Sequence, residues 1–251
     1  MSLSPSIVVP AYHEAATIDA TLSSLNGQPG EVIVVFVGEE TGDAARDHER
    51  TDRVIEDSAA AGPGVARNIG AEAADGDIVL FTDAETVVAP DWVETHREHY
   101  SDEQVVGVGG PVRPRSDSIK HRALFKLLSD YWYRASWQVG FYQLSGWNCS
   151  YRREPFLREG GFDDALPFME DTELSLRIKK HGEVRYDETC WTATSVRRHE
   201  RTGYLSLFSK YARAYTRHYV LDRDIEDEYF PSSDDVTAND VYDTKSVEQQ
   251  R

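Results

Sequence analysis

Cysteine, basic residues and long apolar runs are all scarce in this 251-residue sequence. The two cysteines, Cys149 and Cys190, are too few for a disulfide framework, and neither lies at a metal-ligand spacing. No run of about 18 apolar residues is present, which argues against a transmembrane helix, and the opening residues lack the basic and apolar regions of a secretory signal. We therefore expect a reduced, cytoplasmic setting.

Negative charge dominates the composition. Lys and Arg number 27 against 44 Asp and Glu, which gives a formal net charge of -17. Such a charge opposes nucleic-acid binding, because phosphates would be repelled, and it favours recruitment of a metal cation. It is also the composition expected in a salt-loving organism. Part of the excess lies in residues 222–251, where ten acidic residues face three basic ones, and we expect this tail to be disordered.

Short apolar strands alternate with helical segments through the first half of the chain. This alternation predicts an α/β fold with a mostly parallel sheet covered by helices on both faces. We expect strands at 7–9, 32–35, 52–56, 78–81 and 105–108, and helices at 15–25, 41–49, 65–74 and 91–100.

The second half of the chain differs from the first in composition. Residues 120–145 are dense in aromatic side chains, which indicates a helical subdomain core, a wall of a sugar or lipid site, or both. A helix expected over 170–180 begins with acidic and ends with basic residues, as the helix dipole favours. A last helix, at about 204–221, has an apolar stripe with basic residues beside it. Core packing is the favoured interpretation of that stripe, and a membrane-surface contact is the alternative.

The strand expected over 78–81 is followed by two carboxylates, Asp83 and Glu85. Open α/β sheets bind ligands at the carboxyl ends of their strands. Carboxylate oxygens at such an edge suit a hard divalent cation, which in turn can hold a phosphate. An ordinary acidic turn is the alternative, and only the neighbouring segments decide between the two.

Several segments in series favour the metal site. They are Pro10–Glu14 (Pro-Ala-Tyr-His-Glu), Ala66–Asn68 (Ala-Arg-Asn), Asp83–Glu85, Gly146–Asn148 (Gly-Trp-Asn), Gly160–Asp163 (Gly-Gly-Phe-Asp) and Glu170–Asp171. In this order and at these separations, roughly residues 6–200 resemble the family 2 glycosyltransferases with a GT-A fold. The resemblance implies a Rossmann-like GT-A domain over 1–221, with a nucleotide-sugar-binding half over about 1–112 and a helical, aromatic acceptor half over about 113–221.

The resemblance also implies a reaction. A sugar would pass, with inversion, from a nucleotide-diphosphate sugar to a glycan or lipid-linked acceptor, with Mg²⁺ or Mn²⁺ as cofactor. Asp83 and Glu85 resemble the family's D-x-D, with Glu in place of the second Asp, and would bind the metal that bridges the two phosphates. Asp83 would also reach the ribose. His199 is a further candidate ligand, although a lone His is usually structural.

On the donor side, the resemblance places Pro10, Ala11, Tyr12 and Glu14 against the base and ribose, with Tyr12 stacking on the base. A plain helix-start role for Glu14 is the alternative. The acid that the family usually carries after the second strand is missing, so Glu39 is at best a displaced substitute and the base stays unidentified.

Two further motifs carry implied roles. Arg67 is near the start of a helix, where the helix dipole disfavours a positive charge, so we expect it to have an anionic partner. That partner is either the nucleotide diphosphate or, as the structural alternative, Asp57 or Glu56. The Glu170–Asp171 pair resembles the family's E-D, whose Asp removes the acceptor proton. An ordinary Asp, with a pKa of about 3.9, is ionised at neutral pH and needs no tuning, although a helix cap is the competing interpretation.

The acceptor side rests on Gly146, Trp147 and Asn148, which would line the donor sugar and the acceptor. Trp147 offers an apolar face to a sugar ring. We expect a soluble or peripherally attached enzyme of glycan assembly, acting at the inner membrane face if its acceptor is lipid-linked.

Two other functions stay open. A sugar-nucleotide pyrophosphorylase would need a Gly-rich phosphate loop and a basic residue directly after the first strand, and neither is present. A catalytically silent nucleotide-sugar or glycan-binding module fits the missing acid near Phe36 and the Glu at position 85. The intact Glu170–Asp171 pair argues against that module.

Overall fold

The computed structural model describes residues 3–59, 62–138, 140–166, 168–197, 200 and 203–221. His199 and the acidic segment 222–251 lie outside the described residues, so the expectations placed on them stay untested. Among the helices that the structure describes, none combines the length and apolarity needed to cross a bilayer.

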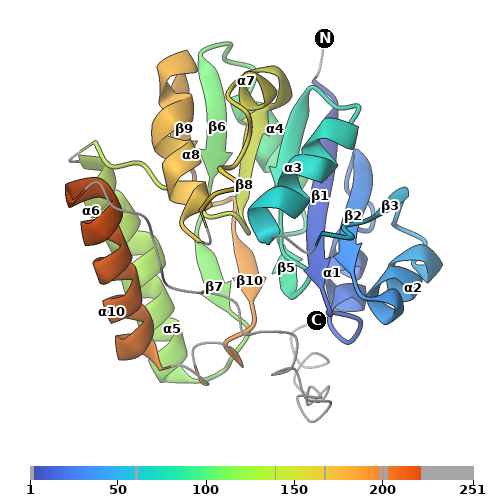
Figure 1. Ribbon diagram of the computed structural model, residues 1–251, viewed down its shortest axis with the longest axis horizontal. Helices are drawn as coiled ribbons and strands as arrows, with labels where there is room; N and C mark the ends of the chain where they lie inside the picture. The colour runs from blue at the N-terminus through green and yellow to red at the C-terminus, as the bar shows by residue number, and fades with distance from the viewer. Residues whose placement is uncertain are drawn as a thin grey trace.

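A seven-stranded sheet in the order β3-β2-β1-β4-β8-β6-β9 forms the centre of the molecule (Figure 1). Every neighbouring pair is parallel except the two that involve β8, which runs antiparallel to β4 and β6. The mostly parallel α/β sheet expected from the sequence is thus confirmed. The strands are β1 (Pro5–Tyr12), β2 (Glu31–Val37), β3 (Arg53–Glu56), β4 (Ile78–Phe81), β6 (Val105–Gly109), β8 (Cys149–Arg152) and β9 (Glu183–Tyr186).

The strand order reverses direction between β1 and β4. The chain adds β2 and β3 on one side of β1 and then returns to place β4 on its other side. At such a switch point the connections leave the sheet in opposite directions and open a crevice at the carboxyl ends of the strands. The segments that follow β1 and β4 therefore meet at this crevice.

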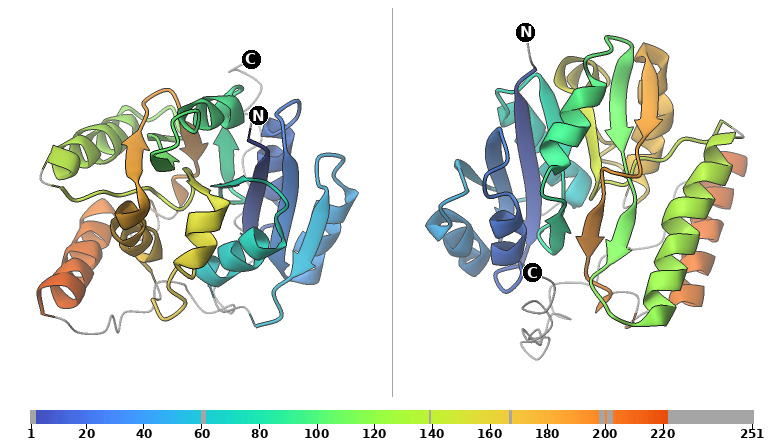
Figure 2. Two further views of the ribbon diagram at one scale, coloured as in Figure 1. Left: turned by 90° about the horizontal axis from the view of Figure 1, so that it is seen from above. Right: turned by 180° about the vertical axis from the view of Figure 1, so that it is seen from behind.

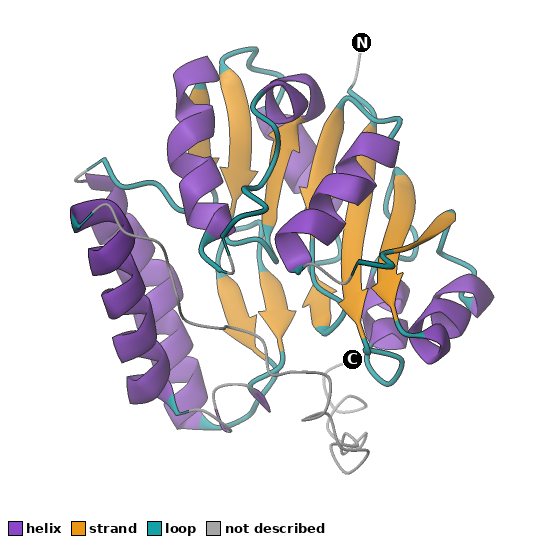
Figure 3. Ribbon diagram, in the orientation of Figure 1, coloured by secondary structure: helices purple, strands orange, loops and turns teal. Residues whose placement is uncertain are grey.

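Helices cover both faces of the sheet, as Figures 2 and 3 show. Alternate residues of β1 point to opposite sides: Ile7 and Val9 belong to one buried cluster and Val8 to another. Because both faces of the sheet are buried, the central strands consist of continuous runs of apolar residues. The first cluster includes residues of α1 (Ile18–Ser24) and α4 (Trp92–His99), and the second includes residues of α3 (Pro63–Ala73), α7 (Arg153–Arg158) and α8 (Glu170–Ile178). Helix α2 (Glu39–Asp47) follows β2, and a 3₁₀ turn, η2 (Lys179–His181), follows α8.

A smaller sheet and a pair of helices complete the fold. The sheet has the order β5-β10-β7, formed by Thr86–Val88, Thr192–Thr194 and Val112–Pro114. The aromatic segment forms one helical run, α5 (Ile119–Lys126), the π-helical η1 (Leu127–Trp132) and α6 (Tyr133–Gln138). The last helix, α10 (Tyr204–Tyr215) with η3 (Thr216–Val220), lies beside it along one edge of the molecule (Figures 1 and 2). The rings of His121 and Tyr204 connect the two, with centroids 5.8 Å apart.

Helix α3 approaches the sheet closely because it has no side chain at Gly70. A Cβ placed there would lie 2.3 Å from Cγ1 of Val8. We expect Gly70→Ala to destabilise the protein by about 1–3 kcal/mol through overpacking. Val8→Ala should itself cost about 1–3 kcal/mol, but the double variant should cost at least about 0.5 kcal/mol less than the sum. Urea unfolding measures all three, and strictly additive losses would show that the close approach is not the constraint.

Candidate active site

Five carboxylates gather at the carboxyl ends of β1 and β4. Glu14 comes from the turn after β1, Asp83 and Glu85 follow β4, and Glu170 and Asp171 begin α8. Their connections through two arginines, described below, bring together segments that are more than 150 residues apart in the chain.

Arg67 joins the end of β4 to the start of α8. Its guanidinium is 4% exposed and donates from Nη1 to Oε1 of Glu170 at 2.7 Å and from Nη2 to Oδ1 of Asp83 at 2.8 Å. Burial alone would lower the pKa of Arg67, but the charges of Asp83 and Glu170 outweigh it and raise that pKa above its ordinary value. Arg67 thus pairs with Asp83 and Glu170. The structural alternative considered from the sequence, a pair with Asp57 or Glu56, was wrong.

The loop at Gly146 holds Asp171 through its backbone. The Gly146 N–H donates to Oδ2 of Asp171 at 2.9 Å, and the Thr172 N–H donates to Oδ1 at 2.7 Å. A Cβ at Gly146 would lie 2.8 Å from the guanidinium carbon of Arg67, so only glycine fits between these two groups. Gly146 therefore contributes an N–H that orients the carboxylate, and it has no side chain to offer a sugar.

The two acidic residues at the start of α8 do not titrate as solvated carboxyls. Burial, and next the charge of Asp171, raise the pKa of Glu170 to about 7. Burial also raises the pKa of Asp171, although the N–H of Gly146 and the charge of Arg67 oppose that rise. Asp171 therefore differs from the ordinary, solvated Asp considered from the sequence, because its surroundings make it a stronger base.

A second arginine, Arg197, joins Glu14 to Glu85. Its Nη2 lies 3.2 Å from Oε1 of Glu14 and 3.2 Å from Oε2 of Glu85. The hydroxyl of Thr17 donates to the other oxygen of Glu14 at 2.6 Å. Arg197 was not identified from the sequence, because the pairing of β10 with β5 is what brings the chain after Thr194 close to Glu14 and Glu85. The neighbouring His199 was noticed instead, and it lies outside the described residues.

The carboxylates have the ligand chemistry that a hard divalent cation prefers. Glu14, Asp83 and Glu85 supply oxygen donors only, and the guanidinium between two of them shows that the position stabilises positive charge. Five carboxylates against two guanidiniums leave the site with excess negative charge. In this arrangement Arg67 holds Asp83 while Arg197 holds Glu85, so the oxygens of Glu14, Asp83 and Glu85 do not converge on one point.

The other residues expected on the donor side lie at the carboxyl end of β1 and at the start of α2, which follows β2. Pro10 and Ala11 end β1, where Ala11 is buried, and Tyr12 is half-exposed with the ring of His13 edge-on to it at 4.7 Å. Glu39 is the exposed first residue of α2.

Asn148 is a structural residue and not a sugar contact. Its side chain has no exposed surface. Its Oδ1 accepts from Nε1 of Trp92 at 2.8 Å, while its Nδ2 donates to the carbonyls of Cys190 at 2.7 Å and Pro111 at 3.1 Å. The expectation for Asn148 was therefore wrong, because every polar atom of the amide is used within the fold. Trp147 is half-buried against a cluster formed by Val112, Phe125 and Val196.

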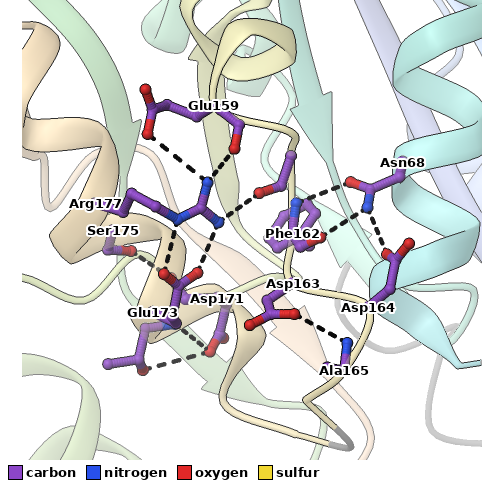
Figure 4. Close-up of polar contacts among 12 residues, drawn as sticks. Asn68, Glu159, Phe162, Asp163, Asp164, Ala165, Asp171, Glu173, Ser175 and Arg177 are labelled. Atoms are coloured by element: carbon purple, nitrogen blue, oxygen red, sulfur yellow. Dashed lines mark hydrogen bonds and ion pairs between the residues drawn. The ribbon is translucent and has the colours of Figure 1, made fainter.

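The Gly160–Asp163 loop is fixed from two sides (Figure 4). The Asn68 amide donates to the Phe162 carbonyl at 2.8 Å and accepts from its N–H at 2.9 Å, while Arg177 donates to the Gly161 carbonyl at 2.7 Å. The loop thereby places the Phe162 ring 5.5 Å from the guanidinium carbon of Arg67. No role for this loop was predicted from the sequence, and in the structure it supports Arg67.

A second group of possible metal ligands lies elsewhere. Within the described residues, the ligand atoms of His99, Asp187 and Cys190 lie within 4.8 Å of one another, next to a cavity of about 510 Å³. His99 and Asp187 already form a hydrogen bond of 2.7 Å. Burial, and next the charge of Asp187, raise the pKa of the Cys190 thiol, which disfavours the thiolate that a metal would need.

Comparison with known proteins connects this geometry to a family. The model of the family described as Glycosyl transferase family 2 matches residues 6–158. The glucosyl-dolichyl phosphate glucuronosyltransferase of Haloferax volcanii is 28% identical over 217 residues, which cover 78% of this chain and 62% of that protein. This chain therefore spans less than two thirds of the length of that relative.

Solved structures show the same fold. The mannosyltransferase PcManGT from Pyrobaculum calidifontis, in complex with GDP-Man and Mn²⁺, matches with a TM-score of 0.67 at 21% identity, over 92% of this chain and 66% of its own. S. aureus TarS (residues 1-349) matches with a TM-score of 0.60 at 18% identity, over 76% of this chain and 60% of its own. The GT-A fold expected from the sequence is confirmed.

The raised pKa of Glu170 predicts a pH dependence of stability. Glu170 binds its proton more tightly in the folded protein than in the unfolded chain, where its pKa is 4.5. The contribution of its retained proton to the free energy of unfolding is therefore fully present below about pH 4.5 and is lost as the pH rises through about 7. Glu170→Gln stays neutral, so its stability relative to wild type should rise between about pH 5 and pH 8 by something of the order of 1–3 kcal/mol.

Urea unfolding in EDTA across this pH range measures the difference between Glu170→Gln and wild type. The exposed Glu40→Gln is the matched control and should follow the wild-type profile. A difference between Glu170→Gln and wild type that stays constant with pH would contradict the account of a carboxyl whose proton is retained by burial.

Proposed function

Since this chain belongs to glycosyltransferase family 2, we propose that it transfers a sugar, with inversion, from a nucleotide-diphosphate sugar to a glycan or lipid-linked acceptor. The observation that carries the proposal is the bridge made by Arg67. It links Asp83, on the donor side, to Glu170, which precedes Asp171, the candidate base. This bridge would hold a donor site and a proton acceptor in a fixed relation, as transfer between two bound substrates requires.

We assign the donor to the crevice between β1 and β4. Pro10, Ala11, Tyr12 and Glu14 would contact the base and ribose, with Tyr12 available for stacking, and Glu39 would lie at the border of this site. Residues 1–112 then form the nucleotide-sugar half and residues 113–221 the acceptor half. The missing acid after β2 leaves the base of the nucleotide open.

A divalent metal, Mg²⁺ or Mn²⁺, would be held by Asp83 and Glu85, with Glu14 and His199 as further candidate ligands. When bound, it would supply neutralisation of the diphosphate leaving group. Two solved structures with the same fold support this choice, since PcManGT was solved with Mn²⁺ and GalNAc-T7 with UDP, GalNAc and Mn²⁺. The guanidinium of Arg197, which lies 3.2 Å from Oε2 of Glu85, would supply a positive charge that suits the donor's diphosphate.

Asp171 is the proposed general base. The N–H groups of Gly146 and Thr172 fix its carboxylate, and burial raises its pKa. A base whose pKa lies closer to neutral accepts a hydroxyl proton more readily while still ionised. The cation of Arg67 keeps the ionised form accessible, and a Glu170 that is protonated part of the time reduces the repulsion between the two carboxyls. The acceptor oxygen would then attack the face of the sugar opposite the diphosphate.

The acceptor is proposed to be a glycan or a lipid-linked sugar. The Haloferax volcanii relative is named for glucosyl-dolichyl phosphate, a lipid-linked substrate. Trp147, half-buried beside the loop that orients Asp171, offers an apolar face at the boundary of the two halves.

Turnover tests the proposal directly. Purified protein with Mn²⁺, a panel of UDP- and GDP-sugars and candidate acceptors should release nucleoside diphosphate, and EDTA should abolish the release. We expect Asp171→Asn to lower kcat by about 10²–10⁴-fold, because the side chain keeps its size but can no longer accept the proton. Asp43→Asn, which makes the same change on the exposed face of α2, should retain wild-type activity.

Two results would go against the proposal. Full activity in Asp171→Asn would remove Asp171 as the base. Metal-dependent nucleotide binding without turnover on any acceptor would favour the silent binding module, which the Glu at position 85 and the missing acid after β2 keep as the second candidate.

A further inference from the structure

The edge formed by residues 119–138 and 204–221, here called the helical edge, exposes large apolar side chains. Eight such side chains are exposed among the residues that the structure describes, and all but Tyr12 lie on this edge. Ile119 is 84% exposed, and Tyr131 and Phe208 are each 59% exposed. The others are Leu127, Trp132, Tyr219 and Leu221. A concentration of this kind marks an interaction surface, whereas scattered apolar residues do not.

The helical edge also has the opposite charge to the rest of the chain. It carries seven basic residues (Lys120, Arg122, Lys126, Arg134, Lys210, Arg213 and Arg217) and one acidic residue, Asp130. The other 20 of the 27 Lys and Arg lie elsewhere, together with 43 of the 44 Asp and Glu. In a chain with a net charge of -17, two adjacent helices that are almost free of acidic residues form a local basic surface.

The helical edge is continuous with the acceptor side of the site. Tyr215 of α10 lies 3.1 Å, hydroxyl to hydroxyl, from Thr172, the residue that follows the candidate base. Tyr215 also packs against Phe168 and Met169, directly before Glu170. A partner bound along α10 is therefore adjacent to the start of α8.

We propose that the helical edge docks on an anionic membrane surface and that this contact presents the acceptor side of the site to the lipid headgroups. Tyr and Trp prefer the interface between headgroups and acyl chains, where their rings are buried and their polar atoms stay hydrated. Lys and Arg stems cover apolar surface while their charges meet anionic headgroups. The second half of the proposal rests on the proposed function, since it places the acceptor in or on that membrane.

Charge favours the membrane over a second copy of this chain. A symmetric dimer through the helical edge would bring two sets of seven basic residues together, and like charges across an interface oppose association. An anionic headgroup layer complements the same charges without that conflict.

Co-sedimentation with phosphatidylglycerol vesicles, compared with phosphatidylcholine vesicles, tests the docking of the full chain. Wild type should sediment with the anionic vesicles in 0.1 M salt. The triple variant Leu127→Ser, Tyr131→Ser, Phe208→Ser should lose at least about fivefold in vesicle affinity at low and at high salt, because apolar burial is not screened. All three side chains are exposed, so the variant should fold, which circular dichroism verifies.

A charge variant separates the two contributions. Lys126→Gln with Arg213→Gln should weaken binding in 0.1 M salt but not in 1 M salt, where the screening length falls from about 10 Å to about 3 Å. The control variant Arg46→Gln with Arg158→Gln also removes two positive charges, here from α2 and α7, and should bind vesicles like wild type. Equal losses in the two charge variants, or equal binding to both kinds of vesicle, would overturn the proposal.

Sedimentation velocity and donor turnover complete the test. If the triple variant converts a dimer to a monomer without changing vesicle binding, the partner is a second copy and the proposal is wrong. Release of nucleoside diphosphate without vesicles reports the site alone, and the triple variant should retain it. Vesicle binding without donor turnover would refute the proposed function and leave the docking proposal intact. Donor turnover without vesicle binding would refute the docking proposal and leave the proposed function intact.

Discussion

The buried guanidinium of Arg67 is the interaction on which the site depends. Asp83 and Glu170 approach each other only because a cation lies between them, and removing one partner of such a buried network would leave uncompensated charge. The surrounding fold is arranged to admit this group. Gly146 leaves room for the guanidinium, and the Asn68 amide holds the loop that places Phe162 against it. The Ala-Arg-Asn, Gly-Trp-Asn and Gly-Gly-Phe-Asp segments thus all help to place the guanidinium of Arg67 between Asp83 and Glu170.

Charge is distributed unevenly at two scales. Within the crevice, five carboxylates exceed two guanidiniums, which suits a site that receives a cation together with an anionic donor. Over the whole surface, the acidic excess is interrupted at the helical edge, where basic and apolar side chains lie beside the acceptor half. This distribution of charge agrees with the metal proposed on the donor side and with the anionic lipid layer proposed on the acceptor side. Tyr215, which contacts Thr172, connects that edge to the base.

Much of this could be predicted from the sequence. The strands of the first half have apolar runs buried on both faces, so their existence and their positions in the chain could be predicted, as could the strand that precedes Asp83 and Glu85. The antiparallel β8 and the β5-β10-β7 sheet were not, because these short strands lack the four-residue apolar run of β4 and are defined by distant partners. Arg197 was missed for that reason. Asn148 was misassigned because a motif position does not reveal that its amide is fully used by Trp92, Pro111 and Cys190.

The most direct test of this account is the affinity of Arg67→Lys for nucleoside diphosphate with Mn²⁺, measured by calorimetry against wild type. Lysine keeps the charge, but its single ammonium cannot form the two-armed bridge between Asp83 and Glu170. If Arg67 organises the donor site, the folded variant should lose at least about tenfold in metal-dependent affinity, equal to about 1.4 kcal/mol. Unchanged affinity in a folded Arg67→Lys protein would contradict the central role assigned to this bridge.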